Sequence, residues 1–148
     1  MSTPKLVIIV LALLAASCSA NAAGHPEIVV DQTTCSHCGM LVSEPAYAAA
    51  YHAPDKEPRV FDDIGCMLDA MRHETASPIT VWLQDAAGGG WLDADQAVFV
   101  TAPSIRTPMN GGVLAYADAS AALNTATTHG GRVMRSLQEL MTWNGAAR

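Results

Sequence analysis

Apolar residues recur along two segments of the chain at the spacing of one helix face. Each segment begins after an aspartate, Asp63 or Asp118, and its apolar positions follow the i, i+3, i+4, i+7 pattern. The two stripes are Ile64, Met67, Leu68 and Met71 in the first segment, and Ala119, Ala122, Leu123 and Ala126 in the second. Aspartate is a good N-cap, because its carboxylate accepts hydrogen bonds from unpaired first-turn N–H groups. The pattern therefore predicts two helices of similar type.

Strand-like runs flank both predicted helices. They are 46–53, 59–61 and 79–83 around the first helix, and 96–102, 113–116 and 132–134 around the second. The triple glycine 88–90 predicts a hinge or a hairpin, Gly130 predicts the end of the second helix, and 136–142 predicts a short third helix. Halves of this size can hardly bury a core alone. We therefore expect an α+β fold in which tandem β-β-α-β repeats, about 35–87 and 91–142, pack as one small unit.

The N-terminal residues 1–17 have the features of a signal peptide. The eleven consecutive apolar residues at 6–16 would extend about 16 Å as a helix, too short to span a hydrocarbon core of roughly 30 Å. Cys18 follows in a sequence that resembles a bacterial lipobox, which predicts a lipid on Cys18 and anchoring to the outer membrane. Ordinary cleavage after the small residues 20–22 is the alternative. Either route exports the protein, and we expect it in the periplasm.

The rest of the chain divides into a tether, 18–34, and a folded domain, 35–148. Hydrophobic residues make up 50% of the chain and charged residues 15%, so intrinsic disorder is disfavoured. The chain has 8 Lys and Arg against 14 Asp and Glu, so we expect no binding to nucleic acid. The unusual feature is sulfur, because so small a chain carries 4 Cys and 7 Met.

Residues 35–40, Cys-Ser-His-Cys-Gly-Met, place two thiols, an imidazole and a thioether close together. Thiolate and thioether are soft donors that suit Cu(I), whereas Mg²⁺ and Ca²⁺ prefer oxygen. In an extended segment Cys38 and Met40 point the same way, and Gly39 lets the backbone bend around an ion. The motif favours a site for Cu(I) or another soft metal.

Three other interpretations of this motif stay open. An exported pair of cysteines readily forms a structural disulfide. Cys35 and Cys38 also have the Cys-x-x-Cys spacing of thiol-disulfide oxidoreductases, although Gly39 and Pro45 leave little room for the helix that such a site uses. Structural zinc would need four ligands, and no second pair follows at the usual spacing.

Further donors lie at the edge of this motif or outside it. Met109 lies in a loop of turn-forming residues, 107–112, where it has little reason to pack in a core, and it is a candidate ligand. Cys66 lies on the first predicted helix but away from its apolar stripe, so it faces a second layer or the metal segment. His37 would point away from Cys38 in an extended chain. Cys35, His37 and Cys66 are therefore secondary candidates.

These motifs together resemble the NosL family, copper-binding lipoproteins associated with the assembly of nitrous oxide reductase. The resemblance covers roughly residues 33–142. It rests on the segments 35–40, 61–68, 105–115, 129–134 and 137–140. The Cys-Gly-Met step at 38–40 is the metal-binding signature of that family.

The resemblance implies a β-β-α-β duplication akin to the organomercurial lyase MerB. It also implies a single Cu(I) held by Cys38 and Met40, with Met109 as the third ligand. The family role is to carry Cu(I) to the copper-sulfide centre (CuZ) of nitrous oxide reductase, docking on the membrane complex NosDFY. We therefore expect a monomeric copper chaperone that is not an enzyme.

Two alternatives come from other functional classes. One is a periplasmic thiol-disulfide oxidoreductase that uses Cys35 and Cys38. The other is a MerB-like enzyme acting on a soft metal, for which Cys38, Cys66 and Asp63 would have to converge. The formal net charge of −6, which becomes −7 when Lys5 is removed with the signal, favours a basic docking face on the partner.

Overall fold

A computed structural model of the protein describes residues 24–54, 56–78 and 80–143. The predicted signal peptide, the lipidation site Cys18 and the first part of the tether lie outside the described residues. Within the described ranges, no helix is long and apolar enough to cross a membrane. The structure therefore bears on the folded domain and on the end of the tether.

Seven strands form one sheet in the order β2-β1-β3-β6-β5-β7, with β4 paired to β3. The strands are β1 (Ala49–His52), β2 (Arg59–Phe61), β3 (Thr80–Asp85), β4 (Gly90–Asp93), β5 (Val98–Thr101), β6 (Val113–Tyr116) and β7 (Arg132–Met134). The helices are α1 (Ile64–Arg72), α2 (Ala119–His129) and α3 (Leu137–Thr142), with short 3₁₀ turns η1 (Pro45–Tyr47) and η2 (Ala94–Gln96). The predicted α+β class is confirmed.

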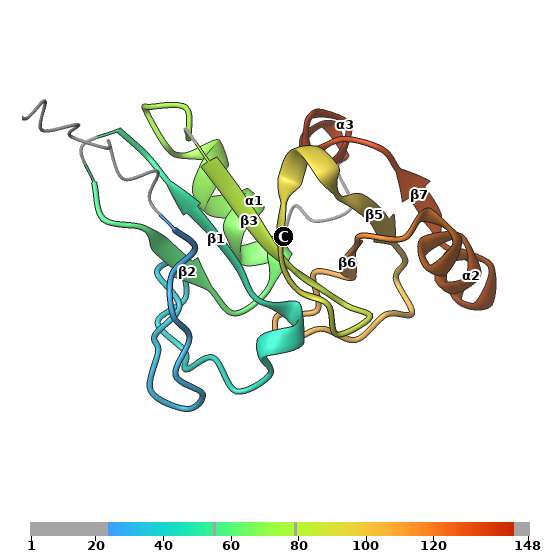
Figure 1. The fold of residues 1–148 in the computed structure, drawn as a ribbon, viewed down its shortest axis with the longest axis horizontal. Coiled ribbons are helices and arrows are strands. Elements are labelled where there is room, and N and C mark those ends of the chain that lie inside the picture. The colour runs from blue at the N-terminus through green and yellow to red at the C-terminus, as the bar shows by residue number, and fades with distance from the viewer. Residues whose placement is uncertain (1–23, 55, 79, 144–148) are drawn as a thin grey trace, which may run out of the picture.

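The two halves of the chain have the same strand arrangement. In the first half β1 lies between β2 and β3 and is antiparallel to both, and in the second half β5 lies between β6 and β7 in the same way. The halves meet where β3 and β6 run parallel, with Asp85 opposite Ala115. Figure 1 shows them side by side, with α1 behind the first half and α2 at the far end of the second. The duplication inferred from the sequence stays a prediction.

The two longer helices begin at the predicted aspartate caps. Asp63 accepts a hydrogen bond from the N–H of Cys66 at 2.8 Å, and Asp118 accepts one from the N–H of Ser120 at 2.6 Å. Helix α2 ends at Gly130, whose φ of 63° is the left-handed conformation that favours glycine. These predicted helix boundaries are confirmed, because each depends on a local interaction within one turn.

Helix α1 covers the main core, whereas α2 packs through small side chains. The largest fully buried side chains include Tyr51, Phe61, Ile64, Met67, Leu68 and Phe99. Ala122 and Ala126 make the buried face of α2, and Leu123 is 59% exposed. The prediction that Leu123 belongs to the apolar face is wrong. Two alanines let the helix lie close to the strands, and Leu123 falls outside that narrow contact.

Strand boundaries differ from the predictions near prolines and glycines. The predicted run 46–53 starts with the turn η1, which Pro45 opens, and the run 96–102 starts within η2. The triple glycine makes a hairpin, one of its two predicted forms, with φ of 90° at Gly88 and 86° at Gly90. Strand β4 after it was not predicted, because a four-residue run that begins with glycine carries little strand signal.

Candidate metal centre

Residues 35–40, called the metal loop below, form a tight turn. The N–H of Gly39 donates to the carbonyl of Cys35 at 3.0 Å, and the N–H of Cys35 donates to the carbonyl of Met40 at 2.7 Å. Gly39 has a φ of 77°, so the chain reverses there. The expectation of an extended segment is therefore wrong. Cys38 lines a cavity, whereas Met40 is 49% exposed on the surface.

Strand β2 holds the metal loop in place. The N–H of Ser36 donates to the carbonyl of Val60 at 2.8 Å, and the guanidinium of Arg59 donates to the carbonyl of Ser36 at 3.0 Å. Arg59 itself lies over the rings of Tyr51 and Phe61, 5.5 and 5.4 Å from their centroids. The loop is therefore fixed by a cation that the aromatic core positions.

Four side chains converge beneath the metal loop. The sulfurs of Cys35, Cys38 and Cys66 and a carboxylate oxygen of Asp62 all lie within 4.8 Å of one another. Cys35, Asp62 and Cys66 are buried, with 1% to 4% exposure, and Cys38 is partly exposed. We call these four residues the thiol cluster. It joins the metal loop, the end of β2 and the first turn of α1.

The thiols of the cluster differ in acidity. A hydrogen bond with the Cys66 thiol lowers the pKa of Cys35 to about 6, against the opposing effect of burial. The same interaction raises the pKa of Cys66 far above its usual range, and burial raises the pKa of Cys38. The Cys66 thiol therefore favours the thiolate form of Cys35 over that of its neighbours.

The carboxylate of Asp63 joins the two halves of the molecule at this site. Its Oδ1 caps α1 through the N–H of Cys66, as described above. Its Oδ2 accepts from the hydroxyl of Thr107 at 2.7 Å, from the N–H of Met109 at 3.0 Å and from the N–H of Gly111 at 3.4 Å. One buried carboxylate thus anchors the Met109 loop of the second half on the helix that carries Cys66.

A cavity of about 180 Å³ opens beside the thiol cluster. Its walls are His37, Cys38, Asp63, Gly65, Cys66, Asp69, Met109 and Gly111. The backbones of Gly65 and Gly111 approach so closely that a Cβ on either would lie 3.0 Å from the Cα of the other. The structure thus brings the predicted donors Cys38, Cys66, His37 and Met109 to one cavity, with Cys35 in the adjoining cluster. Met40 is absent from these walls.

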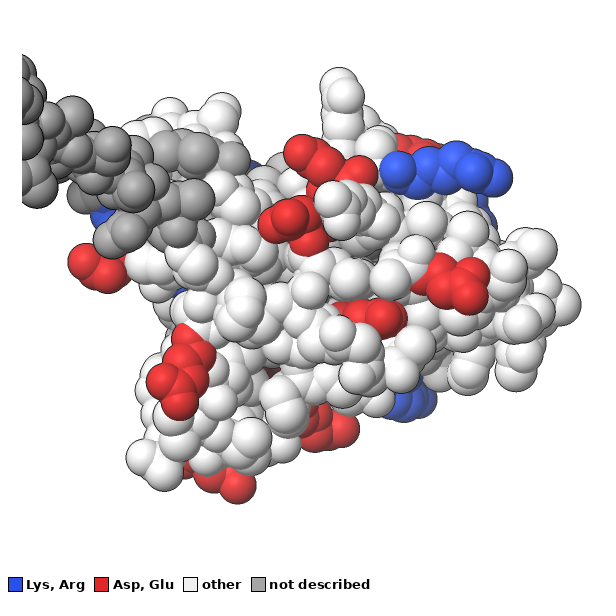
Figure 2. Space-filling view, viewed as in Figure 1, with Lys and Arg blue, Asp and Glu red and all other residues white. Residues whose placement is uncertain are grey.

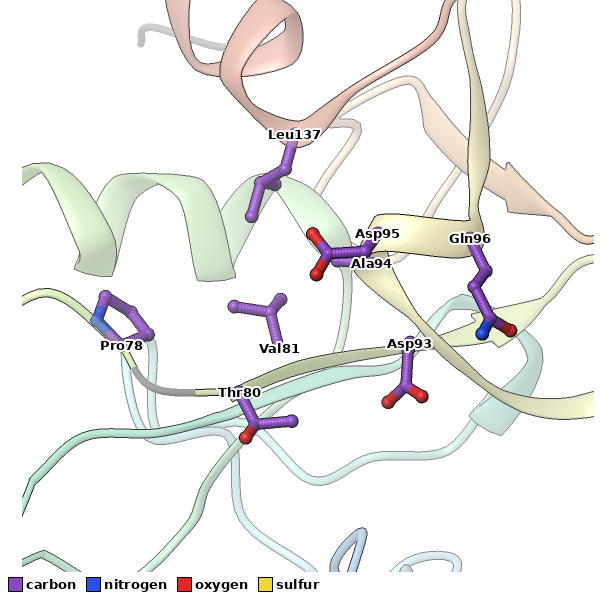
Figure 3. A pocket seen from close by; sticks show the side chains of 8 residues that line it. All are labelled: Pro78, Thr80, Val81, Asp93, Ala94, Asp95, Gln96 and Leu137. Carbon is purple, nitrogen blue, oxygen red and sulfur yellow. The ribbon is translucent and has the colours of Figure 1, made fainter.

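A larger cavity of about 430 Å³ has no comparable chemistry. Figure 3 shows its acidic side chains, Asp93 and Asp95, beside Gln96, with Val81 and Leu137 on other sides. Both aspartates are exposed, and none of the residues lining this cavity carries sulfur or an imidazole. The candidate site is therefore the smaller cavity with the thiol cluster.

Comparisons with known proteins show the family and the fold of the chain. The family model described as NosL matches residues 26–141. The chain belongs to the NosL family. The fold resembles a solved structure titled as the copper chaperone NosL from Shewanella denitrificans, with a TM-score of 0.66 and 17% identity. That likeness covers 75% of this chain and 92% of the other, and no curated protein matches.

In this NosL-family chain the sequence alone did not point to Asp62 as part of the cluster. Its only signal was its place between Phe61, at the end of a strand, and the helix cap Asp63. Two adjacent aspartates in a sequence indicate an exposed helix start, but in the structure Asp62 is only 1% exposed. Chemically, the site offers soft sulfur donors at a partly open cavity and a hard carboxylate oxygen beneath them.

Proposed function

We propose that this NosL-family protein is a metallochaperone that binds Cu(I) and passes it on, and that it is not an enzyme. The observation that carries the proposal is the meeting of Cys38 and Met109, from the two halves of the chain, at one partly open cavity. A thiolate and a thioether are donors that favour Cu(I) over the harder cations of the periplasm. The copper chaperone title of the structural neighbour agrees with this role.

Three residues are proposed as ligands of the copper cargo. Cys38 supplies the thiolate, Met109 supplies a thioether from across the cavity, and Met40 supplies a second thioether from the outer side of the metal loop. The exposed side chain of Met40 swings over Cys38 by rotation about its own bonds. Cys35, Cys66 and His37 lie close enough to add a donor. A site with so few ligands leaves one side of the ion open.

The open side gives a mechanism for transfer. A partner adds its own sulfur or nitrogen ligand to the bound Cu(I), and ligands of the chaperone then leave one at a time, so the ion is never free in solution. Met40 is suited to leave first because it is 49% exposed at the surface. Neutral thioethers add no charge, which keeps Cu(I) less firmly held than a site of thiolates alone would.

The proposed partners are a NosDFY-like membrane complex and nitrous oxide reductase, whose CuZ centre receives the copper. The proposed location is the periplasm, where a lipid on Cys18 anchors a monomer to the outer membrane. Figure 2 shows acidic side chains spread over one face, with few Lys and Arg among them. Such a face favours docking to a basic surface on the partner.

A thiol-disulfide oxidoreductase that uses Cys35 and Cys38 is the second candidate. The lowered pKa of Cys35 favours it. The geometry disfavours it, because Cys35 is 2% exposed and residues 39–44 after the pair form no helix. A MerB-like enzyme is disfavoured too: Cys38, Cys66 and Asp63 do reach one cavity, but hydrogen bonds occupy both oxygens of Asp63.

An anaerobic Cu(I) titration of the reduced full-length protein against a competing chelator tests the proposal. We expect one tightly bound ion in the wild type and a loss of affinity of at least about tenfold, or 1.4 kcal/mol, in Cys38→Ser, Met109→Ala and Met40→Ala. Met71→Ala is the matched control, because Met71 packs on the core away from the cavity. Equal binding by all variants contradicts the proposed ligands, and no binding by the wild type contradicts the chaperone role.

The same variants separate the two candidate functions. An oxidoreductase loses disulfide exchange when Cys38 becomes serine, and it keeps that activity in Met40→Ala. A chaperone loses Cu(I) affinity in both. Insulin reduction, measured in parallel with the titration, therefore distinguishes them.

A further inference from the structure

The three proposed copper ligands do not include three buried groups of the thiol cluster. Cys35, Asp62 and Cys66 lie with Cys38 inside a sphere small enough for one ion, since all four donor atoms are within 4.8 Å of one another. A carboxylate that is 1% exposed is costly unless it is hydrogen-bonded or binds a cation. Asp62 accepts from the N–H of Asp63 at 3.1 Å and from the Cys38 thiol at 3.7 Å, and it also interacts with the Cys66 thiol, so most of its partners are weak thiol donors that a cation could replace.

Three of the four donors are sulfurs, which suit Cu(I) and Zn²⁺ alike, and the fourth, the Asp62 carboxylate, is what separates the two metals. Copper(I) takes sulfur and nitrogen, whereas Zn²⁺ accepts thiolate sulfur and carboxylate oxygen together in tetrahedral sites. Zinc–sulfur bonds of about 2.3 Å place the sulfurs of a tetrahedral site about 3.8 Å apart. The four donors therefore need to close by only about 1 Å to surround a zinc-sized ion.

We propose that Cys35, Cys38, Asp62 and Cys66 form a tetrahedral binding site for a thiophilic divalent cation of the zinc class. This site shares Cys38 with the proposed copper site and uses neither methionine. The two metals therefore compete: a divalent ion that holds Cys38 beneath the cavity prevents copper from binding there. Binding of the divalent ion does not depend on copper binding, whereas the competition between the two metals rests on the proposed function.

The local structure supports four-point binding. Cys35 and Cys38 come from one turn, which the Gly39 N–H closes onto the Cys35 carbonyl at 3.0 Å. Asp62 and Cys66 lie on either side of the Asp63 cap, which fixes the start of α1. The first pair is thus held by a backbone hydrogen bond and the second by the side-chain cap of Asp63, and the ion would join the metal loop to the helix.

Titration of the reduced full-length protein with Zn(II) against a chromophoric chelator tests this proposal. We expect one bound Zn(II) in the wild type and at least tenfold weaker binding in Asp62→Asn, with Cu(I) affinity unchanged within about twofold. Asparagine keeps the size of the side chain and an oxygen to accept from Asp63. Met109→Leu should behave in the opposite way, with weaker Cu(I) and unchanged Zn(II). Asp85→Asn, a buried aspartate on β3, is the control.

Co(II) as a spectroscopic probe gives a second readout that does not depend on Asp62→Asn folding. The wild type should show ligand-field bands of tetrahedral Co(II) and thiolate charge transfer, both weakened in Cys35→Ser. Adding Cu(I) should release the divalent ion in a one-to-one ratio. Absence of Zn(II) binding in the wild type, equal Zn(II) affinity in a folded Asp62→Asn, or simultaneous binding of both metals would overturn the proposal.

Discussion

The two halves of the sheet share one strand order but bury their helices very differently. Six of the nine residues of α1 are buried, whereas only Ala122 and Ala126 are buried among the eleven of α2. The cap of α1 is 0% exposed, and the cap of α2 lies at the surface. The same architecture thus yields a core helix in one half and a covering helix in the other. Only the first half gives the helix start a buried environment in which ligands can be held.

The site lies where the halves meet because two glycines let their backbones touch. Gly65 in the first turn of α1 and Gly111 after Met109 lie so close that a Cβ on either would be only 3.0 Å from the Cα of the other. This approach brings the amides of the Met109 loop within reach of Asp63. The first half supplies cysteines, the second supplies Met109, and the buried carboxylate aligns them. No half alone carries the proposed copper ligands.

Replacing the aspartate cap of each longer helix should give the largest difference in stability between the two halves. Asp63→Ala leaves the Thr107 hydroxyl and the N–H groups of Cys66, Met109 and Gly111 without their acceptor, and should cost on the order of 3 kcal/mol or more. Asp118→Ala removes one exposed cap and should cost about 1 kcal/mol. Urea unfolding of both variants measures the two free energies.

Metal binding sharpens this comparison. Asp63→Ala should weaken Cu(I) binding because it releases the Met109 loop, and Asp118→Ala should leave it unchanged. Asp63→Asn keeps the shape of the side chain but replaces one acceptor oxygen with an NH₂ group that faces other donors. Its Cu(I) affinity should therefore lie between those of Asp63→Ala and the wild type. Equal losses of stability in Asp63→Ala and Asp118→Ala would show that Asp63 acts only as a helix cap.

Features that depend on a few neighbouring residues could be predicted from the sequence. Asp63, Asp118 and Gly130 act within one helical turn, and each does what its residue type favours. The strand runs and the α+β class follow from patterns repeated over many positions. The cysteine motif indicated soft-metal chemistry because ligand type is a property of the residue itself.

Features that depend on packing between distant segments could not be predicted. The inclusion of Asp62 in the cluster requires β2 to end beneath the metal loop, 24 residues from Cys38. Leu123 is exposed because α2 packs on the sheet through Ala122 and Ala126. A helix face made of alanines gives only a weak hydrophobic pattern in the sequence. Met40 does not line the cavity beside Cys38, because a left-handed Gly39 makes a turn where the sequence suggested an extended segment.

Electrostatics gives a second, smaller contrast between the halves. All three ion pairs among the described residues lie within 56–74, where Glu74 binds Lys56 at 2.9 Å and Arg59 at 3.2 Å. Hydrogen bonds from Lys56 and Tyr51 lower the pKa of Glu74 to about 2 from its usual 4.5. A lowered folded-state pKa stabilises the protein above the unfolded value, and that contribution is lost as the pH falls from about 4.5 toward 2.

Glu74→Gln should therefore lower the melting temperature at pH 7 and approach the wild type near pH 2. Thermal unfolding across this range, followed by circular dichroism, measures the difference. Glu139→Gln in the second half is the control, since none of the three ion pairs among the described residues includes Glu139. A constant difference between Glu74→Gln and the wild type from pH 7 to 2 would contradict the role of the ionised carboxylate.

The smallest loss of stability is expected from replacing a left-handed glycine by alanine. This substitution also separates an effect on Cu(I) binding from an effect on stability. Gly39 and Gly130 have φ of 77° and 63°, and a Cβ on either would meet no atom within 4 Å. Alanine at each position therefore costs only backbone strain, about 1 kcal/mol, and urea unfolding should give similar losses for both variants. Gly39→Ala strains the turn that sets Cys38 against Cys35, so it alone should weaken Cu(I) binding. An equal loss of Cu(I) affinity in Gly130→Ala would mean that general destabilisation, and not the shape of the metal loop, controls the site.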